Sequence, residues 1–185
     1  MAAVTVAHTS QLDPATLRTA WLLVREAFLT DRVGGVPGEF TAQDWEHALG
    51  GMHALVHERG ELLAHGSVVP RRFQHRGRAW RVGYVEAVGV AVAARRRGHG
   101  SAVMAALEEV VRTSYEFGAL SATDDGAPLY RARGWVPWQG PVQALTPTGP
   151  VRTPEEDGSV HVLPLGAPLD VTAELTCDWR DGPLW

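Results

Sequence analysis

The chain has 185 residues, a formal net charge of −4 and 45% hydrophobic residues, values typical of an ordinary globular protein. This length predicts a single domain over residues 1–185. We see no apolar run near the roughly eighteen residues of a membrane span, and no signal-peptide pattern at the N-terminus. The one cysteine, Cys177, permits no disulfide within the chain. We therefore expect a cytoplasmic protein that partners neither a membrane nor, being acidic, nucleic acid.

The first fifty residues predict one strand and two helices. Residues 4–8 are a strand candidate, and an Asp-Pro pair starts an amphipathic helix over residues 14–30. Glycines and a proline make residues 31–40 a flexible loop. A short second helix follows over residues 41–49, where a Thr-x-x-Asp start resembles a capping box.

Three antiparallel strands come next, over residues 53–58, 62–73 and 79–92, with turns at Arg59-Gly60 and at residues 76–78. These elements are rich in β-branched and aromatic residues, as strands are.

Three histidines, His53, His57 and His65, lie on the first two of these strands and would fall near one another on the sheet. The chain has neither a cysteine cluster nor an H-E-x-x-H motif, so we expect no metal. We interpret the histidines as hydrogen-bonded strand residues.

A basic turn with two glycines follows the third strand. Gly98 and Gly100 let backbone N–H groups turn toward one point without a Cβ in the way. The helix that follows, over residues 101–117, adds the positive end of its dipole. Such a turn suits a phosphate, and the alternative is an ordinary strand–helix turn with a solvated basic face. Neither the dinucleotide fingerprint nor the P-loop pattern is present.

The remaining elements are shorter. Gly118 is placed at the C-terminus of the long helix. The other predicted elements, in order, are a strand over 119–122, a helix over 128–133 closed by Gly134, a strand or hairpin from 135–138, a proline-rich acidic loop over 147–158, and a last strand over 159–165.

Two motifs in this order resemble the GNAT superfamily of N-acetyltransferases. Arg95-x-x-Gly98-x-Gly100 resembles its acyl-CoA pyrophosphate loop, and Tyr130 followed by Gly134-Trp135 resembles a motif after its fifth strand. The resemblance implies an α/β (α+β) GNAT fold, a mixed central β-sheet flanked by helices on both faces. It also implies acetyl-CoA as co-substrate. The residues implied to hold acetyl-CoA are Val88, Val90, Arg95, Arg96, Arg97, Gly98, His99, Gly100 and Ser101.

Longer stretches are similar to the aminoglycoside 2′-N-acetyltransferases. They lie in collinear order over nearly the whole chain, at residues 40–55, 83–86, 118–121, 134–138, 147–154 and 173–180. The similarity implies Glu86 as a general base acting through ordered water and Tyr130 as the acid that protonates the leaving thiolate. It implies transfer to the 2′-amine of an aminoglycoside, and we also expect a homodimer.

An aminoglycoside is a polycation, so its site should gather carboxylates. The residues that we expect to bind it are Glu39, Asp44, Glu86, Ser121, Glu156, Asp157 and the carboxylate of Trp185. Glu39 and Glu156 stand where the family has aspartates, and Pro183 replaces another aspartate. The loop over residues 31–38 also looks longer than in some relatives. These departures bear on substrate ranking, not on the chemistry.

Three other functions stay open at this point. One is a GNAT enzyme for another polyamine or for a protein amine. The second is a non-catalytic acetyl-CoA-binding module, although Glu86 and Tyr130 are both present. The third, a cation-binding protein without CoA, conflicts with the phosphate loop.

Overall fold

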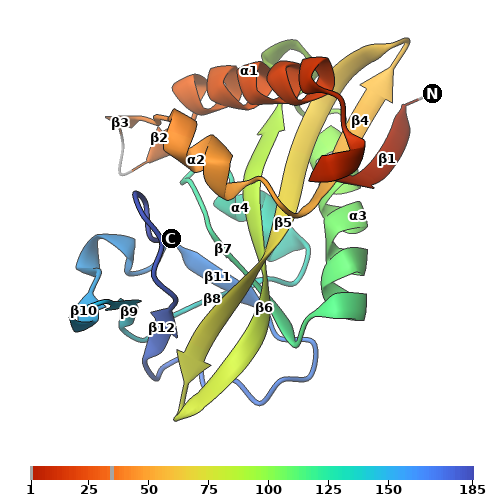
Figure 1. Ribbon diagram of the computed structural model, residues 1–185. Helices are drawn as coiled ribbons and strands as arrows, with labels where there is room; N and C mark the ends of the chain where they lie inside the picture. The colour runs from red at the N-terminus through yellow and green to blue at the C-terminus, as the bar shows by residue number, and fades with distance from the viewer. Residues whose placement is uncertain (1, 34–35) are drawn as a thin grey trace. The chain divides into compact units, whose positions relative to one another are not determined.

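The structure is a computed structural model that describes residues 2–33 and 36–185 (Figure 1). The chain divides into two compact units. The first is Met1–Val69 with Val85–Val110, and the second is Pro70–Tyr84 with Val111–Trp185. The strands β5 (Glu61–His75) and β6 (Arg78–Val90) contribute residues to both units. A single domain over residues 1–185 stays a prediction.

The first unit begins with a strand and a long helix, both predicted. Besides parts of β5 and β6, the elements of this unit are β1 (Ala3–His8), α1 (Pro14–Thr30), β2 (Arg32–Val33), β3 (Val36–Pro37), α2 (Ala42–His47), β4 (Met52–Glu58) and most of α3 (His99–Ser114), with 3₁₀ turns at Thr9–Gln11 and Val92–Ala94. Strand β4 pairs antiparallel with both β1 and β5.

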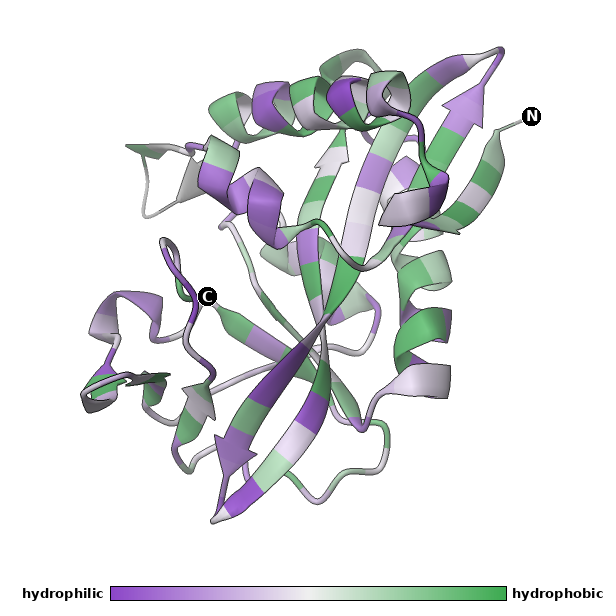
Figure 2. Cartoon of the chain, viewed as in Figure 1, coloured by the Kyte–Doolittle hydropathy of each residue, from purple (hydrophilic) through white to green (hydrophobic). Residues whose placement is uncertain are grey.

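The two first helices begin with the predicted caps. The carboxylate of Asp13 accepts the N–H groups of Ala15 and Thr16 at 2.9 Å, and Pro14 follows it at the first helical position. The capping box of α2 is formed by Thr41 and Asp44. Apolar and polar residues alternate along α1 (Figure 2), and its apolar side packs into the core of the first unit.

Helices cover both faces of the sheet in the first unit. A Cβ built on Gly89 would lie 3.1 Å from Cα of Val24 in α1, whereas one on Gly66 would lie 2.7 Å from Val103 in α3 and 3.2 Å from Val88. Neighbours in a strand point to opposite faces, so Val88 and Gly89 place α3 and α1 on opposite sides. The predicted layering is confirmed.

The second unit carries the remaining strands and one short helix. These are β7 (Phe117–Ser121), α4 (Ala127–Ala132), β8 (Val136–Pro137), β9 (Val142–Thr146), β10 (Gly149–Arg152), β11 (Val160–Leu163) and β12 (Leu175–Cys177), with a 3₁₀ turn at Pro154–Glu156. The strand order is β10-β9-β12-β5-β6-β7-β11-β8. The pairs β6–β7 and β12–β9 are parallel and the other pairs with a printed register in this unit are antiparallel, so the sheet is mixed.

Both predicted hairpin turns are confirmed. The central residues Arg59 and Gly60 have φ of 53° and 84°, and Arg76 and Gly77 have φ of 49° and 73°. Positive φ at both central positions matches the right-handed twist of the flanking strands.

Several predictions of the sequence are wrong in detail. Gly118 does not end a helix but lies in β7, where an added Cβ would come within 2.9 Å of the ring of Trp135. Residues 31–40 contain the β2–β3 hairpin instead of an unstructured loop, although Gly34 and Gly35 lie outside the described residues. The acidic loop contains β10 and a 3₁₀ turn. Strands of two to five residues show too little periodicity to be seen in a sequence.

His53 and His65 are buried and hydrogen-bonded to each other, as predicted for strand residues, and His57 is half-buried. Over residues 2–33 and 36–185, no cluster of three or more His, Cys, Asp or Glu residues would hold a metal ion. Within the same residues, no helix has the length and hydropathy of a membrane span.

Candidate active site

Strand β6 carries the candidate base. Glu86 is half-buried in the first unit, and its carbonyl oxygen accepts a hydrogen bond from the Ser67 hydroxyl at 3.4 Å. Its successor Ala87 has φ of 51°, which is uncommon for a residue other than glycine. The parallel register of β6 with β7 covers Val82–Tyr84. The peptide groups of Val85–Val90 therefore lie beyond this register.

The loop before α3 exposes backbone N–H groups. Gly98 has φ of 85°, and its carbonyl oxygen accepts the N–H of Ala102 at 3.0 Å, so it is the N-cap residue. The next three residues, His99, Gly100 and Ser101, then have N–H groups without an acceptor inside the helix. Three such groups and the helix dipole attract an anion.

Two of the three arginine side chains in this loop bind carboxylates of the first unit. Arg95 lies 3.0 Å from Asp31 and also donates to the Ala27 carbonyl at 2.9 Å. Arg97 lies 3.2 Å from Glu58. Arg96 is exposed and has φ of 60°. The attraction of the loop for an anion therefore depends mainly on its backbone and on Arg96.

His99 is buried, with 7% of its surface exposed. Its Nε2 is among the few buried polar atoms of the described residues that lack a hydrogen-bond partner. A buried polar atom without a partner is costly, and it suits a position beside a polar ligand.

Two acidic residues of the first unit differ in their availability to a cation. Glu39 is exposed. Asp44 accepts the backbone N–H and the hydroxyl of Thr41 at 2.7 and 2.8 Å. Its carboxylate is therefore part of the predicted cap of α2. A cation bound there would compete with Thr41 for the carboxylate oxygens.

Tyr130 lies in the second unit, on the short helix α4. It is buried, and its ring packs edge-on against Trp135 with centroids 6.3 Å apart. Gly134 has φ of 88° and ends the helix, which lets the Trp135 N–H reach the Tyr130 carbonyl at 3.1 Å. The Tyr-x-x-x-Gly-Trp motif is thus a helix with its exit turn.

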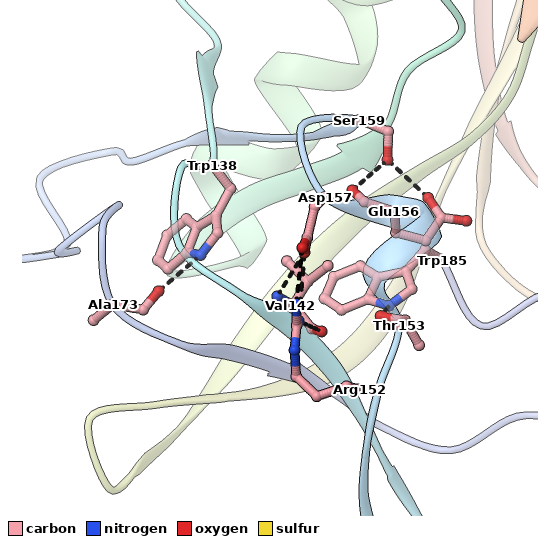
Figure 3. A network of polar contacts seen from close by, with 9 residues as sticks. All are labelled: Trp138, Val142, Arg152, Thr153, Glu156, Asp157, Ser159, Ala173 and Trp185. Carbon is pink, nitrogen blue, oxygen red and sulfur yellow. Dashed lines mark hydrogen bonds and ion pairs between the residues drawn. The ribbon is translucent and has the colours of Figure 1, made fainter. Parts of the chain in front are cut away.

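The acidic segment of the second unit is a hydrogen-bonded network (Figure 3). The carboxylate of Glu156 accepts the hydroxyls of Ser121 and Ser159 at 2.9 and 2.7 Å. Arg152 lies 2.8 Å from Asp157, and its hydrogen bond lowers the pKa of that carboxyl group. Three of the predicted substrate-binding residues, Ser121, Glu156 and Asp157, are therefore close together.

Trp185, the last predicted substrate-binding residue, is also fixed in this unit. Its indole N–H donates to the Thr153 hydroxyl at 2.9 Å (Figure 3), and its ring packs edge-on against Phe73 at 5.3 Å. The Thr153 residue precedes the 3₁₀ turn that carries Glu156. Trp185 is thereby tied to the acidic network.

Sequence reasoning missed Arg71, which holds the segment before Trp185. Its guanidinium, almost fully buried, donates to a carboxylate oxygen of Asp178 at 2.8 Å, to the Asp178 carbonyl at 2.9 Å and to the Leu184 carbonyl at 2.7 Å. It also lies 4.8 Å from the centre of the Tyr84 ring. An arginine within an apolar strand was the signal that would have identified it.

The predicted residues thus fall into two groups. Glu86, Val88, Val90, the loop from Arg95 to Ser101, Glu39 and Asp44 belong to the first unit, and Ser121, Tyr130, Glu156, Asp157 and Trp185 belong to the second. The first group combines a carboxylate with an anion-binding helix start. The second combines carboxylates with a buried phenol.

Comparison with known proteins identifies the family and the fold. Residues 11–137 match the family described as acetyltransferase (GNAT) domain. The structure is similar to the GNAT family N-acetyltransferase YhbS from Escherichia coli, solved in complex with CoA, with a TM-score of 0.64 and 13% identity over 97% of this chain and 90% of that one. It is also similar to Eis1 from Mycobacterium abscessus, with a TM-score of 0.60 and 16% identity over 77% of this chain. This chain spans about a third of Eis1 (33%).

The family match over residues 11–137 identifies the chain as a GNAT acetyltransferase. A curated relative from Mycolicibacterium fortuitum, named aminoglycoside 2′-N-acetyltransferase, is 51% identical over 182 residues, which cover 96% of this chain and 89% of the relative. The chain belongs to the family of the aminoglycoside 2′-N-acetyltransferases.

Replacing Arg71 should release the C-terminal segment of the second unit. Arg71→Met removes the guanidinium from the carbonyls of Asp178 and Leu184 and from one carboxylate oxygen of Asp178, whose other oxygen keeps the Arg72 N–H. The cost is about 2 kcal/mol. We expect faster hydrogen exchange of the amides of residues 178–185. Arg76→Met is the control, because it removes a more exposed pair with Asp170, which contributes little to stability. Equal exchange in both variants would contradict the assigned role.

Proposed function

We propose that this enzyme transfers the acetyl group of acetyl-CoA to the 2′-amino group of an aminoglycoside. The observation that supports the proposal is that Glu86 on β6 and the start of α3, whose N–H groups suit an anion, belong to one unit, with Gly98 twelve residues after Glu86. The choice of amine follows the family to which the chain belongs.

Acetyl-CoA supplies the acetyl group as a reactive thioester. Its pyrophosphate would be held by the N–H groups of His99, Gly100 and Ser101, because these have no acceptor in the helix. The missing Cβ of Gly98 and the exposed Arg96 fit the same role. The peptide groups of residues 88–90, beyond the register with β7, would pair with the pantetheine arm and polarise the thioester carbonyl.

Two side chains would move protons. The substrate amine is mostly an ammonium ion at neutral pH, and it attacks only after losing a proton. The carboxylate of Glu86 would accept that proton through a water molecule. The phenol of Tyr130 would donate its proton to the sulfur of the departing thiolate.

The substrate would be recognised by charge. Glu39 is exposed, whereas the carboxylates of Asp44 and Asp157 already have partners within the protein. Glu156 accepts only neutral hydroxyls in the contacts described, so its charge is not neutralised by Ser121 or Ser159. We therefore expect Glu39 and Glu156 to contribute more than Asp44 and Asp157. A homodimer stays a prediction.

The regiochemistry of the product tests the proposed function. A base and a thioester at fixed positions serve only the amine that the substrate contacts deliver to them. We expect rapid acetylation of tobramycin at the 2′-amine, identified by NMR of the product, and slow turnover of an otherwise identical aminoglycoside with a 2′-hydroxyl group. Acetylation at the 3-amine or the 6′-amine would reject the proposal.

The loop assignment is tested by an alanine at Gly98. Gly98 and Gly60 have nearly equal φ, 85° and 84°, and an added Cβ at either would meet no atom within 4 Å. Each alanine variant should therefore lose about 1 kcal/mol of folding stability from the left-handed backbone. Only Gly98→Ala should weaken acetyl-CoA binding, by about tenfold, because its Cβ stands where the anion approaches. Calorimetric titration of both variants decides, and equal affinities would refute the loop assignment.

The role of Glu86 is tested by its pH dependence. Glu86→Gln should lower kcat about a hundredfold at neutral pH. The loss should shrink as pH rises, because a larger fraction of the amine is then already deprotonated. Glu61→Gln, which neutralises an exposed carboxylate on β5, should behave like the unaltered enzyme. Full activity of Glu86→Gln across the pH range would mean that another group or water is the base.

A further inference from the structure

A row of polar side chains crosses the interior of the first unit and ends beside Glu86. The hydroxyl of Thr9 lies 2.7 Å from Nε2 of His53, whose Nδ1 lies 2.9 Å from Nε2 of His65. Nδ1 of His65 lies 2.9 Å from the carbonyl oxygen of Ala87. Both imidazoles are fully buried. The function proposed above uses neither of them.

With both imidazoles neutral, only one arrangement of protons satisfies the contacts of the two rings. A carbonyl oxygen accepts but does not donate, so Nδ1 of His65 carries a proton. Nε2 of the neutral ring is then an acceptor, and Nδ1 of His53 is its donor. Nε2 of His53 in turn accepts the Thr9 hydroxyl. The N–H of Gly50 donates to the Thr9 oxygen at 2.9 Å, and the Thr9 hydroxyl also lies 3.3 Å from the Gly51 carbonyl. Its proton goes to the shorter contact, the one with His53 at 2.7 Å.

The two imidazoles stay neutral at the pH of an active enzyme. Burial lowers the pKa of His65 to about 3, and burial with the charge of His8 lowers that of His53 to about 4. A second proton on His65 would also place two N–H groups face to face between the rings. The direction of the row is therefore fixed.

The row does not conduct a proton to or from Glu86. Its last member is a peptide carbonyl, which does not take up a proton at these pH values. What the final hydrogen bond does is hold the carbonyl of Ala87. Trp45, with its ring centre 5.4 Å from that of His65, packs against the donor and limits its movement.

Ala87 is the residue in β6 that most needs holding. Its φ of 51° is left-handed, and such residues persist where their surroundings fix them. The methyl group is buried in the apolar cluster with Phe40 and Leu55, and the carbonyl is bound by His65. Together these contacts fix the peptide group between Ala87 and Val88, two rotatable bonds along the backbone from Glu86 and including the Val88 N–H.

We propose that His65 is a positioning residue for acetyl transfer, which directs the Glu86 carboxylate and the Val88 peptide group by holding the carbonyl of Ala87. The proposal rests on the function proposed above for Glu86. His53 and Thr9 fix the tautomer of His65. The Thr9 hydroxyl donates to Nε2 of His53, and Nδ1 of His53 donates to Nε2 of His65, so the proton of neutral His65 is on Nδ1, beside the Ala87 carbonyl.

Two amide substitutions separate this role from a structural one. An asparagine at position 65 places its NH₂ group near the original Nδ1 and retains a donor for Ala87. A glutamine places its amide group near the original Nε2, where its carbonyl oxygen accepts the Nδ1–H of His53, and the Ala87 carbonyl loses its donor. Both put a neutral amide in the same buried site. His57→Gln, at a half-buried position on the same strand as His53, controls for the general loss of an imidazole.

We expect His65→Gln to lower kcat for acetyl transfer to tobramycin about tenfold at neutral pH, the effect of losing one well-placed hydrogen bond. The loss should shrink toward high pH, where the amine needs less help from Glu86. His65→Asn and His57→Gln should stay within about twofold of the unaltered enzyme. The ¹³C chemical shift of the Ala87 carbonyl should change in His65→Gln and not in His65→Asn. Acetyl-CoA affinity should be unchanged in all three.

If kcat falls equally in His65→Gln and His65→Asn, or falls by the same factor at every pH, His65 has only a structural role and the proposal is wrong. So would a His65→Gln enzyme with full kcat. The unaltered enzyme is assayed first. If it acetylates tobramycin and the variants do not differ, the inference fails and the proposed function stands. If it acetylates no amine, the proposed function fails and the inference with it.

Discussion

The first turn of α3 is the constraint on which the acetyl-CoA site proposed for the first unit depends. Its N–H groups at residues 99–101 have no acceptor inside the helix, and Gly98 caps it with a backbone conformation that side-chain-bearing residues rarely adopt. The two arginines on either side of Arg96 pair with Asp31 and Glu58. These pairs fix the loop against α1 and β4, and leave the backbone N–H groups and Arg96 as the donors available to the proposed pyrophosphate.

The backbone between Glu86 and the start of α3 changes direction twice. An extended strand leads to Glu86, a left-handed residue follows, and the 3₁₀ turn at Val92–Ala94 leads to the loop. Strand, kink, turn and helix start are consecutive in the sequence. Glu86 and the proposed anion site are therefore separated by only a short piece of chain. Helix α1 packs closely on β6 at Gly89, and α3 packs closely on β5 at Gly66.

In the second unit, the carboxylates of the acidic segment are bound by other side chains of the protein. Glu156 and Asp157 are bound by hydroxyls and by Arg152, and Trp185 is bound through Thr153 and Phe73. The buried guanidinium of Arg71 fixes the segment that leads to Trp185.

The sequence by itself determined the long elements, their caps and turns, and the order of motifs that identifies the family. Helix α1, the strands β4 to β6 and the loop before α3 depend on local signals: an Asp-Pro start, two Arg-Gly turns, and glycines where φ is positive. Tertiary structure alone decided the rest. The short strands β9, β10 and β12 exist because they pair with each other or with β5, and the contacts of His65 with Ala87 and of Arg71 with Leu184 join residues 22 and 113 positions apart. No local pattern encodes such a contact, because its free energy appears only when the folded chain brings both partners out of water together.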